Sequence, residues 1–214
     1  TLTDAVAITN SVTGQIIPGK TEGTNFTGSL LVGHATTGTL NAASNNTGVG
    51  IAALDALTSG DSNTAIGYQS GTKITTGGNN TAIGETSLFL NTSGSSNTAM
   101  GHQSLYALAS GSNNTAVGRV ALSSTTGDNN VGIGKSAGSN ITSGDGNVII
   151  GVNTNADSAT GDRQLKISGN DGSTATTWIS GDSSGNVTVA GTLTTSSGLV
   201  AAQADVTALA IALG

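Results

Sequence analysis

The sequence predicts an all-β fold, a parallel β-solenoid of 17-residue repeats in which three copies of the chain share one core. Three observations predict it. Glycines recur in register through the middle of the chain. The columns between them alternate as the two faces of a β-strand do. Large side chains are too scarce for an ordinary compact domain, because 33 of the 214 residues are glycine and only 2% are aromatic.

The chain begins with residues 1–28, which hold no glycine register. Residues 5–8 and 15–17 are apolar enough to form short strands, and Pro18 and Gly19 predict a turn after the second. We expect this part to be a lead-in or attachment segment.

The glycine column defines the repeats, which we place at residues 29–152. Its members lie 17 residues apart, except for one step of 16 between Gly118 and Gly134. Such a register over about 120 residues is the signature of a repeat architecture. The column consists of Gly33, Gly50, Gly67, Gly84, Gly101, Gly118, Gly134 and Gly151.

An asparagine column lies four residues before these glycines. It predicts a ladder of stacked side-chain amides at a turn, each bonded to its neighbours along the stack. Its members are Asn46, Asn63, Asn80, Asn97, Asn114, Asn130 and Asn147.

Two further columns share one face of the predicted strand. The aliphatic column, one residue before the glycine, is Val32, Val49, Ile66, Ile83, Met100, Val117, Ile133 and Ile150. The threonine column, three residues before the glycine, is Leu30, Thr47, Thr64, Thr81, Thr98, Thr115, Val131 and Val148. Because Val and Leu replace Thr in it, we expect this face to be apolar and to point inward.

The remainder of each unit holds a weaker apolar pair, such as Leu54 and Leu57, so each unit is expected to be strand, turn, weaker strand, turn. A three-sided helix of one chain needs an apolar strand on every side. With one strongly apolar strand per unit, a single chain would leave much of its inner face uncovered. Three chains closing a shared core would solve this, since homo-oligomers favour closed cyclic symmetry.

Two segments follow the repeats. Residues 153–196 are expected to form a small β-rich collar, because residues 164–167, 176–179 and 186–189 alternate with period two between Gly-containing turns. Residues 197–214 predict the start of a coiled-coil helix, whose seam has spacings of 3, 4, 3 and 4. The seam consists of Leu199, Ala202, Val206, Leu209 and Leu213.

Composition and charge exclude several classes. A net charge of −6 with six basic residues argues against nucleic-acid binding, and the absence of cysteine excludes disulfide frameworks. No apolar run approaches 18 residues, so no membrane insertion is expected. We expect no enzyme activity, cofactor or metal site.

Several short motifs resemble catalytic or binding signatures. Residues 132–137 fit a dinucleotide fingerprint and residues 181–185 a nucleophile elbow, but the repeat explains the first and no histidine follows the second. His34 and His102 lie directly after repeat glycines, in a column we expect to face solvent; three copies of His102 on an axis remain an alternative ion site. The threonine column could suggest ice binding, which the inward assignment excludes.

The units at residues 62–70 (SNTAIGYQS), 79–85 (NNTAIGE) and 96–106 (SNTAMGHQSLY) resemble the left-handed parallel β-roll repeats of trimeric autotransporter adhesin heads. Their 17-residue spacing is more similar to the version in bacteriophage tail fibres, and residues 178–187 resemble the shaft sequences that follow such repeats. The resemblance covers about residues 29–152.

This resemblance implies an intertwined homotrimer that is structural, extracellular and part of a virion. Its expected function is a tail-fibre shaft that supports host attachment, with other virion proteins and a host receptor as partners and the receptor-binding tip outside this segment. A bacterial surface adhesin head and a polysaccharide-degrading tailspike are the alternatives.

Overall fold

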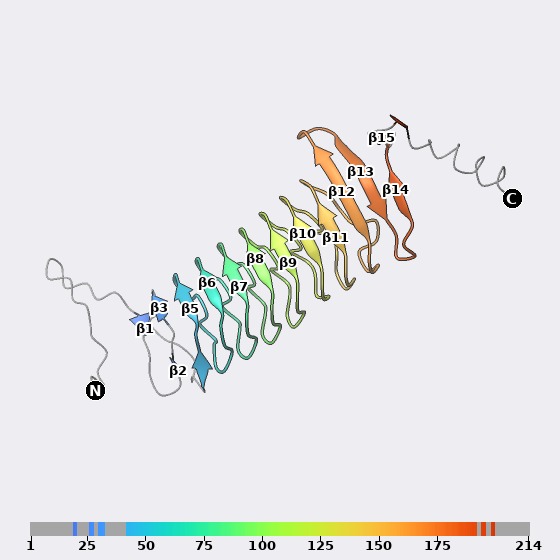
Figure 1. Ribbon diagram of the computed structural model, residues 1–214. Helices are drawn as coiled ribbons and strands as arrows, with labels where there is room; N and C mark the ends of the chain where they lie inside the picture. The colour runs from blue at the N-terminus through green and yellow to red at the C-terminus, as the bar shows by residue number, and fades with distance from the viewer. Residues whose placement is uncertain are drawn as a thin grey trace.

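The computed structural model describes residues 19–20, 26–27, 30–32, 42–191, 194–195 and 198–199, with side chains at 30–32 and 42–191. This part is an all-β parallel solenoid of about eight turns, followed by antiparallel strands (Figure 1). The strands are β1 (Gly19–Lys20), β2 (Phe26–Thr27), β3 (Leu30–Val32), β4 (Ala43–Ser44), β5 (Thr47–Val49), β6 (Thr64–Ile66), β7 (Thr81–Ile83), β8 (Thr98–Met100), β9 (Thr115–Val117), β10 (Val131–Ile133), β11 (Val148–Ile150), β12 (Leu165–Asn170), β13 (Ala175–Gly181), β14 (Val187–Val189), β15 (Thr194–Thr195) and β16 (Gly198–Leu199).

Each repeat contributes one three-residue strand to a single long sheet. Neighbouring strands pair in parallel, with Thr64 opposite Thr81 and Ile66 opposite Ile83. The sheet has 12 strands in the order β1-β3-β5-β6-β7-β8-β9-β10-β11-β12-β13-β14. One repeat therefore advances the chain by one strand spacing of about 4.8 Å.

The central residue of each strand points into the solenoid, and the two flanking residues point outward. Ala65, between Thr64 and Ile66, is fully buried, whereas Ile66 is exposed and Thr64 is half-buried. The expectation that the threonine and aliphatic columns face inward is therefore wrong for the single chain. Alternation places the two columns on one face, but it does not say which face the rest of the same chain covers.

The other half of each unit consists of successive turns and not of the weaker strand expected from the sequence. Backbone φ is positive at alternate positions, as at Gln69 (53°) and Gly71 (57°). The Gln69 N–H donates to Ile51 O in the preceding unit at 2.9 Å, while the Gly71 N–H donates to Ser87 O in the following unit at 2.9 Å. These turns therefore satisfy their backbone groups in both directions along the axis.

The solenoid has a core made by one chain, which corrects the expectation that a single chain would leave its interior open. The apolar residues of the turn segments, such as Leu54 and Leu57, are fully buried against the central strand residues. Most of those central residues are alanine or glycine, because the turn leucines reach them; Leu31 and Ile149 are the larger ones. A Cβ on Gly132 would lie 2.6 Å from Leu122 Cγ.

Two antiparallel pairings form the C-terminal end of the sheet. Strand β12 pairs in parallel with β11 and antiparallel with β13, and β13 pairs antiparallel with β14. The β12–β13 register shifts between Ile167 and Ser168, so Trp178 is an extra residue opposite the shift. Figure 1 shows these longer strands continuing the stack of solenoid strands.

The terminal predictions fall mostly outside the described residues. The strands expected at residues 5–8 and 15–17 lie there, as does the seam of Ala202, Val206, Leu209 and Leu213. Leu199, the first seam residue, lies in β16, which pairs with β15. Residues 198–199 are therefore extended and not helical.

Candidate assembly interface

The asparagine column links each repeat to the next by side-chain hydrogen bonds. The side-chain oxygen of Asn63 accepts hydrogen bonds from the Asn80 backbone N–H and from Asn80 Nδ2, both at 3.0 Å. Asn80 Nδ2 also donates to Gly94 O at 2.9 Å. Every asparagine of the column is buried, from Asn46 to Asn147. Each buried amide therefore has partners above and below, which keeps the strands in register.

The glycine column ends each strand at the same place. Gly84 has a φ of +131°, and a Cβ there would lie 2.7 Å from the carbonyl carbon and oxygen of Gly101. A side chain here would therefore push apart two successive repeats, which form neighbouring rungs of the solenoid. Gly50, Gly67, Gly101, Gly118, Gly134 and Gly151 also have φ values between +124° and +136°. Gly33 lies outside the described residues.

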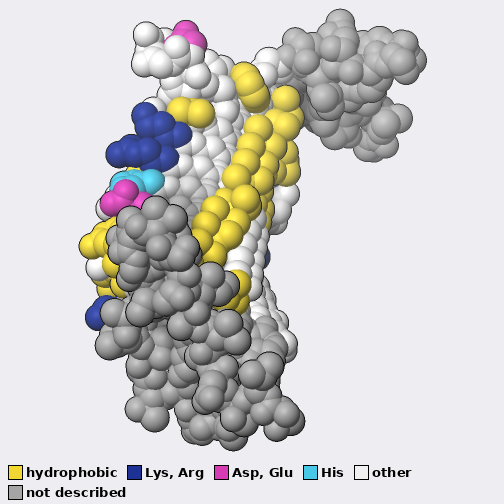
Figure 2. Space-filling view, turned by 90° about the vertical axis from the view of Figure 1, so that its left-hand side faces the viewer, with side chains coloured by type: hydrophobic (Ala, Val, Ile, Leu, Met, Phe, Trp, Pro, Cys, Tyr) yellow, Lys and Arg dark blue, Asp and Glu magenta, His cyan; other side chains and the backbone are white. Residues whose placement is uncertain are grey.

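The aliphatic column forms an exposed row on the outward face of the sheet. Val49, Ile66, Met100, Val117 and Ile133 are each between 36 and 41% exposed. The other two members, Ile83 and Ile150, are half-buried. Figure 2 shows a continuous band of hydrophobic side chains running along the molecule.

The row does not stop where the solenoid ends. Ile150 lies opposite Ile167 on β12, Ile167 opposite Ile179 on β13, and Ile179 opposite Val189 on β14. Because paired residues point to the same side of a sheet, these residues continue the aliphatic column. From Val32 to Val189 the row crosses eleven strands, or roughly 48 Å at 4.8 Å per strand.

The threonine column lies beside this row on the same outward face. Thr47, Thr64, Thr81, Thr98 and Thr115 are half-buried, and the column becomes aliphatic at Val131, Val148 and Leu165. It then continues through Gly181 to Val187, by the β12–β13–β14 register. None of the described residues in the two columns is charged.

The charged and aromatic side chains of the solenoid lie outside these two columns. The residue after each glycine is solvent-exposed in most units, as at Ile51, Tyr68, Glu85, Arg119 and Lys135. Figure 2 shows acidic, histidine and basic side chains along an edge separate from the hydrophobic band. Phe89 and Tyr106 stack in parallel, with ring centroids 5.1 Å apart. Charge is therefore confined to surfaces away from the apolar face.

The histidine and carboxylate candidates form no ligand set. His102 is half-buried with a buried Nδ1 that has no hydrogen-bond partner, and His34 lies outside the described residues. Within the described part of the chain, no group of three or more His, Asp or Glu side chains could hold a metal ion. The exposed aspartates bond backbone N–H groups of the preceding unit, as Asp145 Oδ1 does with Asp128 N at 2.7 Å.

The two enzyme-like motifs are structural elements of the fold. Residues 131–133 are strand β10, and the following Gly134–Lys135 segment enters turns, where a phosphate loop would need a helix. In the second motif Asp182 Oδ1 accepts hydrogen bonds from Ser184 N (2.9 Å) and Asn186 N (3.0 Å). The Asn186 side chain and backbone lower the pKa of Asp182, so this carboxylate stabilises the turn between β13 and β14.

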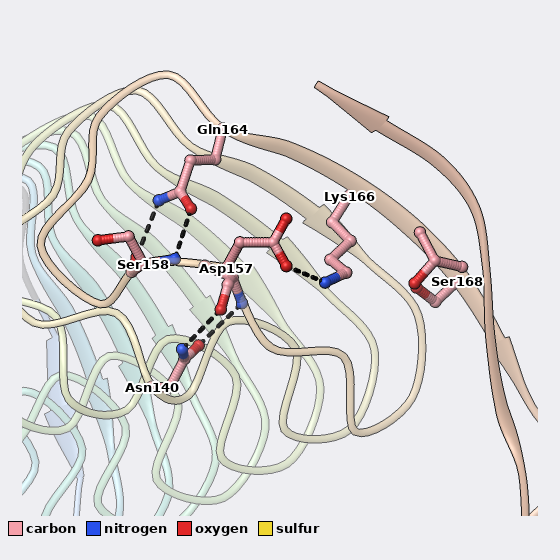
Figure 3. Close-up of polar contacts among 8 residues, drawn as sticks. Asn140, Asp157, Ser158, Gln164, Lys166 and Ser168 are labelled. Carbon is pink, nitrogen blue, oxygen red and sulfur yellow. Dashed lines mark hydrogen bonds and ion pairs between the residues drawn. The ribbon is translucent and has the colours of Figure 1, made fainter. Parts of the chain in front are cut away.

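A polar junction connects the last solenoid turn to β12 (Figure 3). Gln164 occupies the position of the next ladder asparagine, and its Nε2 donates to Asn147 Oδ1 at 3.1 Å. The same amide bonds the backbone N–H and carbonyl of Ser158, at 2.7 and 2.8 Å. Lys166 and Asp157 form an ion pair beside it. The junction therefore ties β12 to the ladder and fixes where the antiparallel strands begin.

The sequence alone identified the columns of this candidate interface. It did not show that these columns continue through Ile167, Ile179, Val187 and Val189. The positions of these residues depend on how β12, β13 and β14 pair, and the turns between these strands differ in length. The alternation at residues 164–167, 176–179 and 186–189 was the only signal for them.

Comparisons of the chain with protein-family models, with curated proteins and with solved structures give no match. Among the described residues, no helix is long and apolar enough to cross a membrane.

Proposed function

We propose that the chain is a structural, non-enzymatic protein that assembles into a homotrimeric rod, and that this rod is a shaft segment of a bacteriophage tail fibre. One observation carries the proposal. An uncharged apolar row runs unbroken along the outward face of a sheet of eleven consecutively paired strands, from β3 to β14. Soluble monomers rarely expose a contiguous apolar patch of that extent, and such patches mark sites of association.

A second and third copy of the same chain are the partners that fit this face best. The face repeats once per strand spacing, and only a surface with the same period can contact every rung equally. Another copy provides that period. The absence of charge from both columns also removes the desolvation cost that would oppose close packing.

Three copies, and not two, are favoured by the resemblance of the repeat units to trimeric fibre and adhesin repeats. Closed cyclic symmetry would bury the row of each copy around one axis and leave the charged and aromatic side chains outside. The core of each solenoid would then stiffen a rod that holds a receptor-binding tip, and the other virion proteins and the host receptor would be its further partners.

The same rod would serve a bacterial surface adhesin, which remains the second candidate because it would use the same apolar face. A signal peptide upstream and a membrane-anchor barrel downstream in the precursor would select the adhesin, whereas neighbouring tail or baseplate genes would select the fibre. Incubating the purified protein with host polysaccharide tests the third candidate, a degrading tailspike, for which we expect no cleavage.

The test of assembly is the molar mass in solution, measured by light scattering after size exclusion. We expect the unmodified chain to be a trimer and the double variant Ile66→Asp/Ile83→Asp to be a monomer that keeps its β-type circular dichroism. Ile51→Asp is the matched control, since Ile51 is 66% exposed but lies outside the apolar face. A monomeric unmodified chain, or a trimer in the double variant, would refute the proposal.

A further inference from the structure

The repetitive part of the apolar face cannot by itself define how copies align along the axis. In β5–β9 every strand presents a threonine and, two residues later, a valine, isoleucine or methionine. Sliding one copy by a single rung would place the same kinds of side chain against each other again. A repetitive face of this kind specifies register weakly, as uniform strands do in sheets.

The face departs from this repetition at β3, where Leu30 stands in the threonine column, and over several strands towards its C-terminal end. The threonine column becomes Val131, Val148 and Leu165, and it then has a gap at Gly181, which carries no side chain. Val187 follows the gap and is exposed. No other described rung of this column has a glycine.

The same strands depart from the solenoid in direction and in shape. Strands β13 and β14 run antiparallel, and the extra residue Trp178 interrupts the β12–β13 register. Ile179 and Val189 nevertheless continue the aliphatic column without a break. Strands β12–β14 thus combine an apolar surface continuous with the proposed interface and a register shift that occurs once among the described strand pairings.

We infer that β12–β14 form a register clamp, which aligns the copies of the chain by packing Ile179, Val187 and Val189 against the equivalent strands of the other copies. This inference rests on the self-association proposed above. A one-rung slip would move Val187 of one copy away from its matching position, while it would leave the contacts of β5–β9 nearly unchanged. The clamp then sets the axial alignment of the copies, and the solenoid strands provide most of the length over which the copies are in contact.

Cysteine cross-linking tests this directly, because the chain contains no cysteine. Chains carrying Ile66→Cys and chains carrying Met100→Cys are co-expressed, and the disulfide-linked peptides are identified by mass spectrometry. The two positions are two rungs apart, or roughly 10 Å along the axis, which is too far for a disulfide between aligned copies. Aligned copies therefore give 66–66 and 100–100 links. A slip by one rung brings residue 66 of one copy to within one rung of residue 100 of another, about 5 Å along the axis, and a slip by two rungs places them level, so slipped copies give 66–100 links.

The clamp variant is Ile179→Ser/Val187→Ser/Val189→Ser in both chains. We expect it to remain trimeric while the 66–100 fraction rises at least tenfold. The control variant Ile51→Ser/Tyr68→Ser/Val152→Ser changes three exposed side chains outside the apolar face and should keep the 66–100 fraction at the unmodified level. Fluorescence of Trp178, the single tryptophan, reports whether β13 stays folded.

Three results would overturn the inference while leaving the proposed function intact. They are a trimeric clamp variant with no increase in 66–100 links, a clamp variant that loses the trimer, and abundant 66–100 links in the unmodified chain. Abundant 66–100 links in the unmodified chain can be measured without the clamp variant, so this result tests the inference even if that variant misfolds. A chain that gives no intermolecular link and stays monomeric would instead refute the proposed function.

Discussion

The side-chain oxygen of Asn63 receives two hydrogen bonds from Asn80, one from its backbone N–H and one from its side-chain nitrogen, each 3.0 Å long. This relationship recurs along the solenoid, so each buried amide acts as acceptor for one neighbour and as donor to another. It explains how a chain with so few large side chains holds its strands together. The turn-side leucines fill the core, and the ladder fixes the spacing of the rungs.

Removing one amide from this ladder should be costly. Asn80→Ala would remove the shorter of the two side-chain hydrogen bonds to Gly94 O, the other coming from Asn91 Nδ2, and it would remove the acceptor of two N–H groups of Asn97. We expect a loss of about 2–4 kcal/mol in the free energy of unfolding, measured with guanidinium. The neighbouring change Asn79→Gly is the control, because Asn79 is exposed and has a φ of 59° that glycine adopts readily. Equal stabilities of the two variants would contradict the role of the ladder.

A methyl group in the glycine column should separate two rungs. Gly84→Ala combines a positive φ with a Cβ 2.7 Å from the Gly101 backbone, so we expect a loss of about 3–5 kcal/mol in thermal or guanidinium unfolding. Gly172→Ala is the matched control. Its φ is also positive, at +100°, but nothing lies within 4 Å of the new Cβ. If both variants lose the same stability, backbone strain and not rung contact explains the column.

One buried hydroxyl offers a stabilising change. Thr125 Oγ1 is buried without a hydrogen-bond partner, in the position that Leu108 and Ile141 occupy in neighbouring units. Thr125→Val keeps the shape and removes the unsatisfied group, so we expect a gain of about 1–2 kcal/mol in unfolding free energy. Thr126→Val should give no gain, because Thr126 Oγ1 donates to Thr142 O at 3.1 Å. A destabilised Thr125→Val variant would argue against an unsatisfied hydroxyl.

The turn between β13 and β14 should weaken in acid. Hydrogen bonds from the Asn186 side chain and backbone lower the pKa of Asp182 below its ordinary value of about 3.9. The carboxylate therefore contributes stability above that value, and the contribution disappears as the pH falls through the lowered pKa. Asp182→Asn keeps the shape of the side chain but has no such charge.

The measurement is urea unfolding followed by Trp178 fluorescence, at pH 7 and at pH 2. We expect the unmodified chain to exceed Asp182→Asn in stability at pH 7 and to match it at pH 2. A difference that does not change with pH would show that the charge of Asp182 does not stabilise this turn.

Much of the candidate interface could be predicted from the residue columns. The period of 17 places Ile66 beside Ile83 and Asn63 beside Asn80, because an in-register parallel stack repeats every column at every rung. The continuation of the aliphatic column through Ile179 and Val189 could not be predicted so firmly. It depends on two antiparallel pairings and on the extra residue Trp178, whose position no periodic pattern encodes.

The amino-acid sequence by itself determined the repeat, the ladder of amides, the glycine positions and the pairing of the threonine and aliphatic columns on one face, since all of these follow from local periodicity. Only the tertiary structure decided which face is inside. Leu54 and Leu57 fold across from the turn segments and cover the small central residues of the strands, so the chain completes its own core and leaves Ile66 and its neighbours outward. The cause is side-chain volume: the leucines leave room for nothing larger than alanine or glycine at most central strand positions, and a strand with those small residues turned inward must turn its aliphatic residues out.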